Sequence, residues 1–267
     1  MSTPEDARQQ AHDLGLDDKV LGIIQAAVSS PLTPLTLRSG ALDEEFDDPR
    51  FTGRVEPSEY EGEATLMLDV LSATVPRDDA FRIVASLQRQ LQPLGCQALV
   101  AAHVGHSDWG QILNLGITDA SEEYGDKSLV VFFKAPDHAP LLWVRQTNGV
   151  NADVYTRDVI DRLDAWAEQC SLAVLGARWD WVEIRFDTIP DDLEEYAEEV
   201  VEFCPDTIDQ AVVKAPPEHL AGKSGEELSE EEMEEMMEFM EEALEEQHSG
   251  DLAEYLAREK RLFLWWD

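Results

Sequence analysis

The spacing of hydrophobic residues changes several times along the chain, and each change marks an expected element. Apolar side chains that recur every three or four residues share one face of a helix. The stripe of Val84, Leu87 and Leu91 is an example, and residues 76–79 (Pro-Arg-Asp-Asp) place proline and acids where a helix begins. We predict one or two helices at 4–28 and further helices at about 76–91, about 191–203 and 251–259. Another helix is predicted to start at Thr156 as its N-cap.

Shorter apolar runs predict strands. They lie at 64–71, 97–104, 128–135, 141–147, 172–177, 180–186 and 261–266. In 180–186 apolar residues alternate with Trp181, Glu183 and Arg185, which predicts one buried face and one wetter face. The run 261–266 is apolar on both faces, so we expect it to lie inside a sheet. Helices would cover one side of that sheet, and the N-terminal helices or the other half of the protein would cover the second side.

The order of these elements predicts an α+β fold made of two tandem ferredoxin-like (split βαβ) halves packed together, because each half reads strand, helix, strand, strand. Residues 1–61 form N-terminal helices and, from 29, a linker rich in Pro, Gly and acids. The first α/β half is 62–136 and the second is 137–267. The second half includes an acidic helical insertion at about 215–249.

The net charge of -37 is concentrated in one part of the chain. Residues 187–254 hold 25 Asp and Glu against two Lys, a net charge of -23, which is more than half of the total. Such a field repels a phosphate backbone, so direct binding to nucleic acid is disfavoured. It attracts basic proteins and steers their approach. Adaptation to a saline host is a second explanation, although it would spread the acids over the whole surface.

Other features of composition narrow the class of protein. No apolar run approaches the roughly 18 residues that a membrane span needs. The N-terminal MSTPEDARQQ lacks the basic and apolar regions of a secretory signal. Cys96, Cys170 and Cys204 are odd in number and widely spaced, which does not indicate a disulfide framework. We expect a cytoplasmic protein without a cofactor.

Four segments resemble a known family in order, spacing and sequence. They are QTNGVNADV (146–154), WDWVEIRF (179–186), EFCPDTIDQ (202–210) and the terminal LFLWWD (262–267). Together they resemble the uncharacterised bacterial family named domain of unknown function 4253, with looser similarity back to about residue 62. The chain departs from that family in its extra acidic stretch at 215–249. The resemblance implies a fold outline and a set of positions, and it implies no reaction.

Cys204 is the first candidate for chemistry. It follows Val200 on the apolar stripe of the helix and lies near the helix C-terminus, which disfavours a thiolate, so we interpret it as a structural cysteine. The alternative is a polar site formed where two loops converge. Its candidate residues are Cys204, Asp206, Asp209 and Gln210 from one loop and Asn148, Asn151 and Asp153 from the other. For the second loop we favour turn formation over a polar site.

Three other motifs are incomplete. His103, His106 and Asp108 lack a further ligand pair for a metal site. Residues 105–109 end in Trp where a nucleophile elbow requires Gly. The Gly-Lys-Ser at 222–224 lacks the first glycine of a phosphate loop. We therefore predict no metal site.

The acidic insertion contains a predicted helix with a methionine stripe. Ser229 and Glu232 form a capping box at its start. The stripe residues are Met233, Met236, Met237 and Met240, and flanking acids are Glu234, Glu235, Glu241 and Glu242. Either the stripe docks on the body of the protein, or these eight residues bind a basic partner.

Three functions remain open. We favour a non-enzymatic binding protein of the immunity or inhibitor kind that blocks a basic partner. The second is a hydrolase-like enzyme with a polar site in the loops at 147–153 and 204–210. The third is a structural or assembly subunit.

Overall fold

The computed structural model describes residues 4–43, 46–58, 63–102, 127–208 and 249–266, together with Ser229, Glu232, Met233, Glu235 and Met237. The helices are α1 (Pro4–Asp13), α2 (Asp18–Ala27), α3 (Ala80–Leu91), α6 (Ala139–Arg145), α7 (Thr156–Gln169), α8 (Leu193–Phe203) and α11 (Ser249–Glu259). The strands are β1 (Thr33–Asp43), β2 (Arg54–Pro57), β3 (Glu63–Pro76), β4 (Cys96–Ala102), β5 (Lys127–Lys134), β6 (Leu172–Ala177), β7 (Trp181–Phe186) and β8 (Arg261–Trp265). The α+β class is confirmed.

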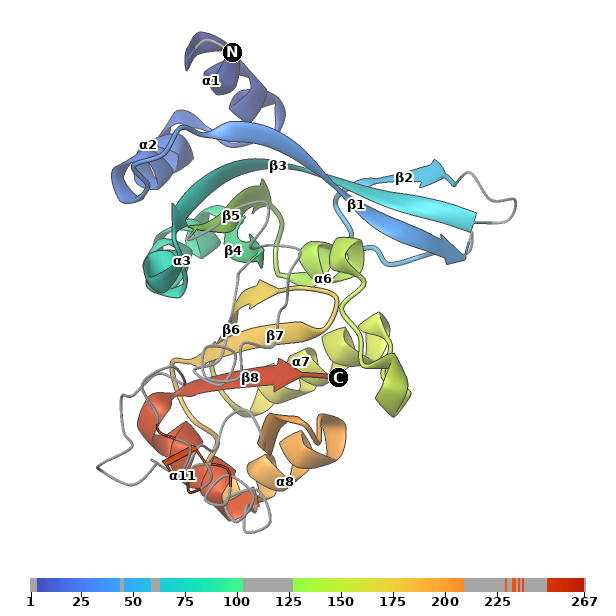
Figure 1. The fold of residues 1–267 in the computed structure, drawn as a ribbon. Coiled ribbons are helices and arrows are strands. Elements are labelled where there is room, and N and C mark those ends of the chain that lie inside the picture. Colours follow the sequence, from blue (N-terminus) through green and yellow to red (C-terminus); the bar gives the residue numbers. More distant parts are fainter. Residues whose placement is uncertain are drawn as a thin grey trace.

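All the strands join one twisted sheet with the order β1-β3-β5-β4-β6-β7-β8, and β2 pairs with β3 (Figure 1). The pairs are antiparallel except for β4 with β6, which run parallel. One core lies between the sheet and α1, α2 and α3, and a second lies between the sheet and α6, α7, α8 and α11. The expectation of helices on both faces is therefore confirmed, and the N-terminal helices cover the second face.

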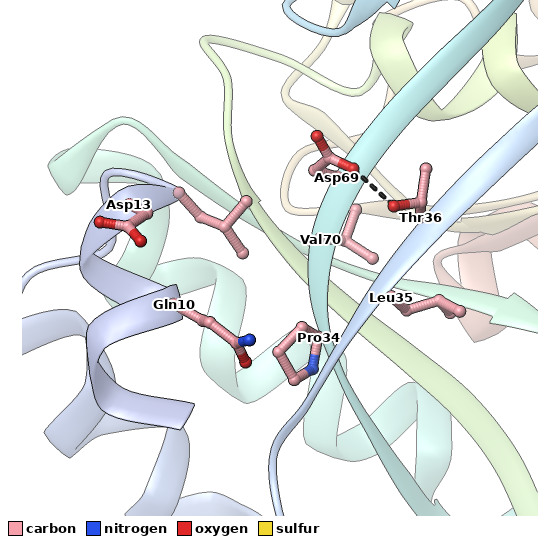
Figure 2. A pocket seen from close by; sticks show the side chains of 8 residues that line it. Gln10, Asp13, Pro34, Leu35, Thr36, Asp69 and Val70 are labelled. Atoms are coloured by element: carbon pink, nitrogen blue, oxygen red, sulfur yellow. Dashed lines mark hydrogen bonds between the residues drawn. The ribbon is translucent and has the colours of Figure 1, made fainter. Parts of the chain in front are cut away.

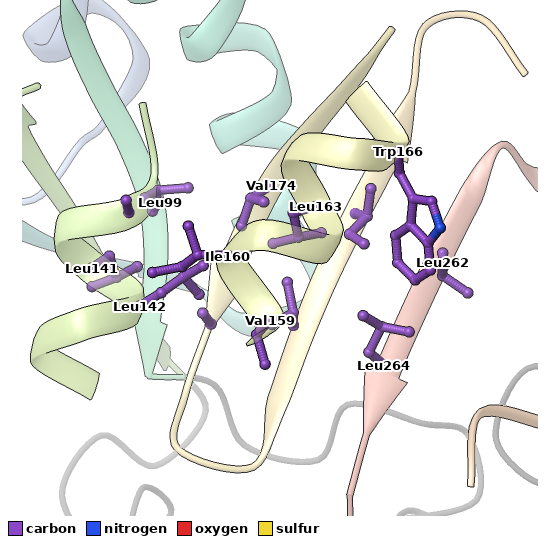
Figure 3. Close-up of a cluster of buried hydrophobic side chains, with 14 of the residues drawn as sticks. Leu99, Leu141, Leu142, Val159, Ile160, Leu163, Trp166, Val174, Leu262 and Leu264 are labelled. Atoms are coloured by element: carbon purple, nitrogen blue, oxygen red, sulfur yellow. The ribbon is translucent and has the colours of Figure 1, made fainter. Parts of the chain in front are cut away.

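The helical stripes account for both cores. In α3, Val84, Leu87 and Leu91 are fully buried. In α7, Val159, Ile160 and Leu163 point at the sheet (Figure 3). Helix α7 begins at Thr156 as its first residue, so the predicted N-cap is wrong by one position. The side chain of Asp158 accepts the N–H of Tyr155 at 2.8 Å and completes the cap.

The parallel join between β4 and β6 unites the two parts of the sheet. The register there pairs Val100 with Gly176, where a Cβ would lie 2.7 Å from the Val100 carbonyl oxygen. The buried side chain of Gln88 donates hydrogen bonds to the carbonyls of Ala98 in β4 and Val174 in β6. Glycine thus permits the close approach, and a helix side chain on one face bridges the seam.

The first half contains a split βαβ unit, because β5 lies between β3 and β4, which are joined through α3. The second half differs from the prediction. Residues 141–147 do not form a strand, because Ala139–Arg145 is the helix α6. A buried apolar run does not distinguish a strand from a helix by its period, and the side chain of Asp137, which accepts the Ala139 N–H at 2.9 Å, favours the helix. The tandem ferredoxin-like arrangement is therefore not confirmed.

Residues 29–61 are not simply a linker. They contain β1 and β2, which pair with the long strand β3. Pairing with a distant strand supplies hydrogen bonds that no local pattern reveals. Pro34 and Gly40 lie within β1, and these residues had favoured a loop.

Strand β8 is buried on both faces but is not inside the sheet. Leu262, Leu264 and Trp266 pack in one core, Phe263 packs in the other, and Trp265 is half-buried. The strand lies at the end of the sheet order, so the predicted interior position is wrong. Apolar residues on both faces of a strand indicate that helices cover both faces. In this protein helices cover both faces of an edge strand as well.

The predicted wetter face of β7 is also wrong for two of its residues. Trp181 and Glu183 are both buried, because α3 covers this face. Glu183 forms an ion pair with Arg261, and Arg185 donates to the Ala85 carbonyl of α3 at 3.1 Å. Pairing of charged side chains with a helix and a neighbouring strand permits their burial.

Candidate functional site

The four segments that resemble the family meet around one side chain, Trp266. Its backbone N–H donates to the Asp180 carbonyl at 3.0 Å, and its indole N–H donates to the Phe203 carbonyl at 3.5 Å. Gly149 packs against the indole ring, so that a Cβ there would lie 2.2 Å from Cδ1. The loop at 147–153 and the end of α8 therefore contact the same residue from two directions.

The indole of Trp266 contacts Gly149 in one loop and the Phe203 carbonyl just before the other. The candidate catalytic residues of the two loops differ in exposure. Asn151 and Asp153 are exposed, Asp206 is half-buried, and Asp209 lies outside the described residues. The left-handed backbone of Asp153 (φ 56°) supports the interpretation of its loop as a turn.

Cys204 is fully buried at the C-cap of α8. Its thiol donates to the Trp265 carbonyl at 3.0 Å, next to the edge of the sheet. Burial raises the pKa of this thiol to about 12. A catalytic cysteine needs a lowered pKa, so the geometry favours the structural interpretation.

Asp180 is more deeply buried than Asp153 or Asp206. It lies in the turn before β7 and is 4% exposed, and its Oδ1 has no hydrogen-bond partner among the described residues. Burial raises its pKa against the opposing charge of Arg178. The sequence assigned Asp180 to a strand, and no local signal marked its burial.

Helix α8 presents a continuous acidic surface. Residues 187–208 hold nine Asp and Glu and no Lys or Arg. The exposed acids of α8 and the turn before it are Asp191, Asp192, Glu194, Glu195, Glu198 and Glu202. The opposite face of the helix packs Tyr196, Ala197 and Val200 into the core. These six acids therefore face solvent, whereas Glu199 is half-buried.

A cavity of about 370 Å³ opens at the N-terminal end of α8. Its lining residues are Gln169, Pro190, Asp191, Asp192, Glu195, Tyr196 and Glu199. The side chain of Asp192 caps the helix by accepting the Glu195 N–H at 3.1 Å. Acids are stable in the first turn because the helix dipole is positive there. The same residues make the wall of the cavity negative.

A guanidinium already lies beside this cavity. Arg162 of α7 approaches Glu199 at 3.7 Å and stacks over the rings of Trp166 and Phe203, with 5.9 and 5.2 Å to the ring centroids. Glu199 also accepts the Trp166 indole N–H at 3.2 Å. Glu199 is thus paired within the protein.

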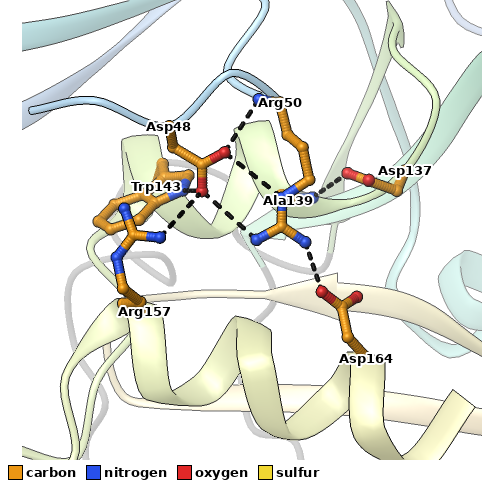
Figure 4. Close-up of polar contacts among 7 residues, drawn as sticks. All are labelled: Asp48, Arg50, Asp137, Ala139, Trp143, Arg157 and Asp164. Atoms are coloured by element: carbon orange, nitrogen blue, oxygen red, sulfur yellow. Dashed lines mark hydrogen bonds and ion pairs between the residues drawn. The ribbon is translucent and has the colours of Figure 1, made fainter.

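A second polar cluster attaches the loop before β2 to α6 and α7 (Figure 4). Asp48 is buried and accepts the Trp143 indole N–H at 2.8 Å and the Arg50 backbone N–H at 2.9 Å. Arg50 also donates to Asp164 of α7 at 2.5 Å. Burial alone would raise the pKa of Asp48, but the hydrogen bonds from Arg50 and Trp143 outweigh it and lower that pKa. Both carboxylates are paired, as in a structural anchor.

A smaller cavity of about 260 Å³ lies between α1 and the β1–β3 pair (Figure 2). Leu14, Leu35 and Val70 supply its apolar wall. Thr36 donates to Asp69 at 2.6 Å on its polar side. Asp69 is already paired with Thr36, so we assign no chemistry to this cavity.

The predicted methionine helix lies mostly outside the described residues. Ser229 and Glu232 form the predicted capping box, with a bond of 2.9 Å from the Ser229 N–H to the Glu232 carboxylate. Met233 and Met237 are 42% and 67% exposed, and Glu235 is exposed. Five residues of the predicted partner-binding helix lie outside the described part of the chain: Met236, Met240, Glu234, Glu241 and Glu242. The residues of the incomplete motifs also lie outside it: His103, His106, Asp108 and 222–224.

The described part of the chain shows neither a metal site nor a membrane-spanning helix. No group of three or more His, Cys, Asp or Glu there is placed to hold a metal ion. None of its helices has both the length and the apolar character required to cross a bilayer.

Comparison with known proteins identifies the family but no activity. No curated protein and no solved structure matches the chain. A protein family described as a domain of unknown function, DUF4253, matches residues 129–267, which is a little more than half of the chain. The match starts in β5 and includes every segment that meets at Trp266. The chain therefore belongs to the DUF4253 family.

Proposed function

We propose that this protein is a non-enzymatic binding protein that captures a basic protein partner through the acidic surface of α8. The observation that carries the proposal is the run of nine acids without a base at 187–208, with the α8 acids on one exposed face. Complementary charge steers a basic partner into contact and raises the association rate. The exposed side chains of Met233 and Met237 support an apolar contact with the same partner.

An immunity or inhibitor role fits this proposal, because the partner would be blocked by charge and shape without any reaction. A cytoplasmic location also fits it, since Cys96, Cys170 and Cys204 are all free.

The test begins with the immobilised protein and the basic proteins of its native host at low salt. A retained partner is then purified, and its association rate is measured over a range of ionic strength. We expect that rate to fall steeply with salt. Replacing Glu194, Glu198 and Glu202, which are exposed acids of α8, with Gln should slow association while the melting temperature changes little. A host without any retained basic protein, or a rate that is insensitive to salt, would refute the proposal.

The methionine stripe is tested separately by replacing Met236 and Met240 with Ala. Loss of binding at unchanged thermal stability would identify the stripe as a contact surface. Loss of thermal stability would mean that the stripe packs on its own protein.

A hydrolase-like enzyme is the second candidate, and Asp180 is the observation that favours it. Burial raises the pKa of this acid, and its backbone carbonyl accepts the N–H of Trp266, whose ring contacts Gly149 and the Phe203 carbonyl. Burial of this kind prepares a general acid. Hydrolysis of any ester, amide or phosphate substrate that is abolished by Asp180→Asn would support this candidate.

An assembly subunit is the third candidate, supported by the position of β8 at the edge of the sheet. Its test is the oligomeric state in solution. A monomer at all accessible concentrations would exclude self-assembly through this edge.

A further inference from the structure

The geometry points to the cavity at the N-terminal end of α8 as the site that receives an arginine side chain of the basic partner. This inference rests on the proposed function and adds the place and the chemistry of recognition. The cavity measures about 370 Å³ and has the acids Asp191, Asp192 and Glu195 on its wall. A concave site of this size holds a guanidinium group and part of its aliphatic stem.

The cavity at α8 is lined by acids that are not neutralised within the described protein. Glu199 is paired with Arg162, but Asp191, Asp192 and Glu195 have no basic partner among the residues that the structure describes. Three carboxylates within one concavity repel one another, and a cation placed among them removes that repulsion. The cavity therefore favours a positively charged group.

An independent polar group lies at the same place. Tyr196 lines the cavity and is 1% exposed, and its hydroxyl has no hydrogen-bond partner among the described residues. A buried hydroxyl without a partner is unusual and costs free energy, so a ligand that supplies a donor gains from it. The ring itself is held between Trp166 and Phe186, with centroid distances of 5.2 and 5.9 Å.

The number and geometry of N–H donors distinguish arginine from lysine. A guanidinium carries five N–H donors in a planar fork, so it can bond two carboxylates and a hydroxyl at once. An ammonium group is a compact point charge that is strongly hydrated. Arg162 illustrates the preference, because its guanidinium meets an acid of α8 while it stacks on Trp166 and Phe203 at the adjacent surface.

The experiment compares two triple variants of α8 that change the net charge equally. The cavity variant is Asp191→Asn, Asp192→Asn and Glu195→Gln, in which Asn keeps the capping ability of residue 192. The control variant is Glu194→Gln, Glu198→Gln and Glu202→Gln, which removes three exposed acids outside the cavity. Fluorescently labelled octaarginine and octalysine are the probes, and affinity is measured by fluorescence anisotropy in low-salt buffer with the full-length protein.

We expect the cavity variant to weaken octaarginine binding about tenfold more than the control variant does. Octalysine should be weakened to the same small extent by both, because it responds mainly to the overall field. A third variant, Tyr196→Phe, should weaken octaarginine about two- to threefold and leave octalysine unchanged. Because it removes an unpaired buried hydroxyl, this variant should melt no lower than the wild type, so weaker binding would not reflect unfolding.

Three results would overturn the inference, each in a different way. Equal weakening of octaarginine by both triple variants would exclude the cavity but leave the proposed acidic surface standing. Failure of the wild-type protein to bind either peptide at low salt would overturn both. A cavity variant that weakens both peptides equally would exclude selection of the guanidinium group.

Discussion

Adding one methyl group at Gly149 should test whether Trp266 joins the two loops. Gly149→Ala places a Cβ at 2.2, 2.4 and 2.6 Å from Cδ1, Cγ and Nε1 of the Trp266 indole. Ordinary carbon contacts are about 3.5–4.0 Å, so the ring or the loop must move by more than 1 Å. The backbone of Gly149 has φ −126°, which alanine adopts without strain. Any loss of stability therefore comes from the steric clash.

The expected change in the free energy of unfolding is the sum of three contributions. Overpacking a well-packed core costs about 1–3 kcal/mol. Moving the indole also breaks its hydrogen bond to Phe203, which adds about 1 kcal/mol. Against this, alanine restricts the unfolded chain and stabilises by about 0.4–1 kcal/mol. The net expectation is a loss of about 1–3 kcal/mol in the free energy of unfolding.

The assay is urea unfolding followed by far-ultraviolet circular dichroism, in a double-mutant cycle with Trp266→Ala. Trp266→Ala alone should cost about 3–5 kcal/mol. In that background the clash is absent, so Gly149→Ala should cost nothing or should stabilise slightly. Gly22→Ala is the matched control, because a Cβ at Gly22 in α2 meets no atom within 4 Å and should stabilise by about 0.5–1 kcal/mol.

Two outcomes would refute this reasoning. An equal cost of Gly149→Ala in both backgrounds would show that the clash is not with Trp266. A stabilisation like that of Gly22→Ala in the wild-type background would show that the loop does not pack on the ring.

Three further predictions concern titratable groups. Because the pKa of Cys204 is raised from 9.0 to about 12, its thiolate should be about 1000-fold rarer near pH 8 than in the unfolded chain. Iodoacetamide, with labelling detected by mass spectrometry, should therefore modify Cys204 only in denaturant. Rapid labelling of the native protein would contradict the burial of this thiol. Asp48→Asn should lower the free energy of unfolding by about 2–3 kcal/mol at neutral pH, because Arg50 and Trp143 lose a charged acceptor. The pKa of Asp48 in the folded protein lies below the ordinary 3.8, so the stability that this carboxylate contributes is complete above 3.8 and is lost as the pH falls through the folded pKa. When the free energy of unfolding in urea is plotted against pH, Asp48→Asn should therefore reduce the loss of stability at acid pH. An unchanged loss at acid pH would contradict the pairing of Asp48 with Arg50 and Trp143. The Asp180→Asn variant should melt no lower than the wild type near neutral pH, because the raised pKa of Asp180 means that burial disfavours its carboxylate. A large decrease in melting temperature would show that Arg178 stabilises this carboxylate more than burial destabilises it.

The candidate residues illustrate how far sequence analysis reaches toward a site. The two loops and Cys204 were identified from local motifs, and the burial of Cys204 follows from its position on the stripe of α8. The role of Trp266 between those loops was not predictable, because it depends on β8 pairing with β7 and on α8 covering the strand end. The cavity at α8 was equally hidden, since Tyr196 reads as an ordinary core residue in the helical stripe.

The sequence by itself determined the elements whose signal is periodic and local. The stripes of α3, α7 and α8 and the apolar runs of β5, β6 and β7 appear in the structure near their predicted places. A helix forms all its backbone hydrogen bonds within one segment, so its pattern is readable from that segment. The acidity of 187–208 is also a property of sequence alone.

Only the tertiary structure decided the elements whose partners are distant. Strand β1 forms because β3 offers a pairing edge, and the apolar run at Ala139–Arg145 becomes a helix because it is buried between the sheet and α7. The edge position of β8 and the parallel seam at Gly176 depend in the same way on which strands meet. Strand pairing and burial are long-range contacts, and a local pattern of apolar residues is compatible with several of them.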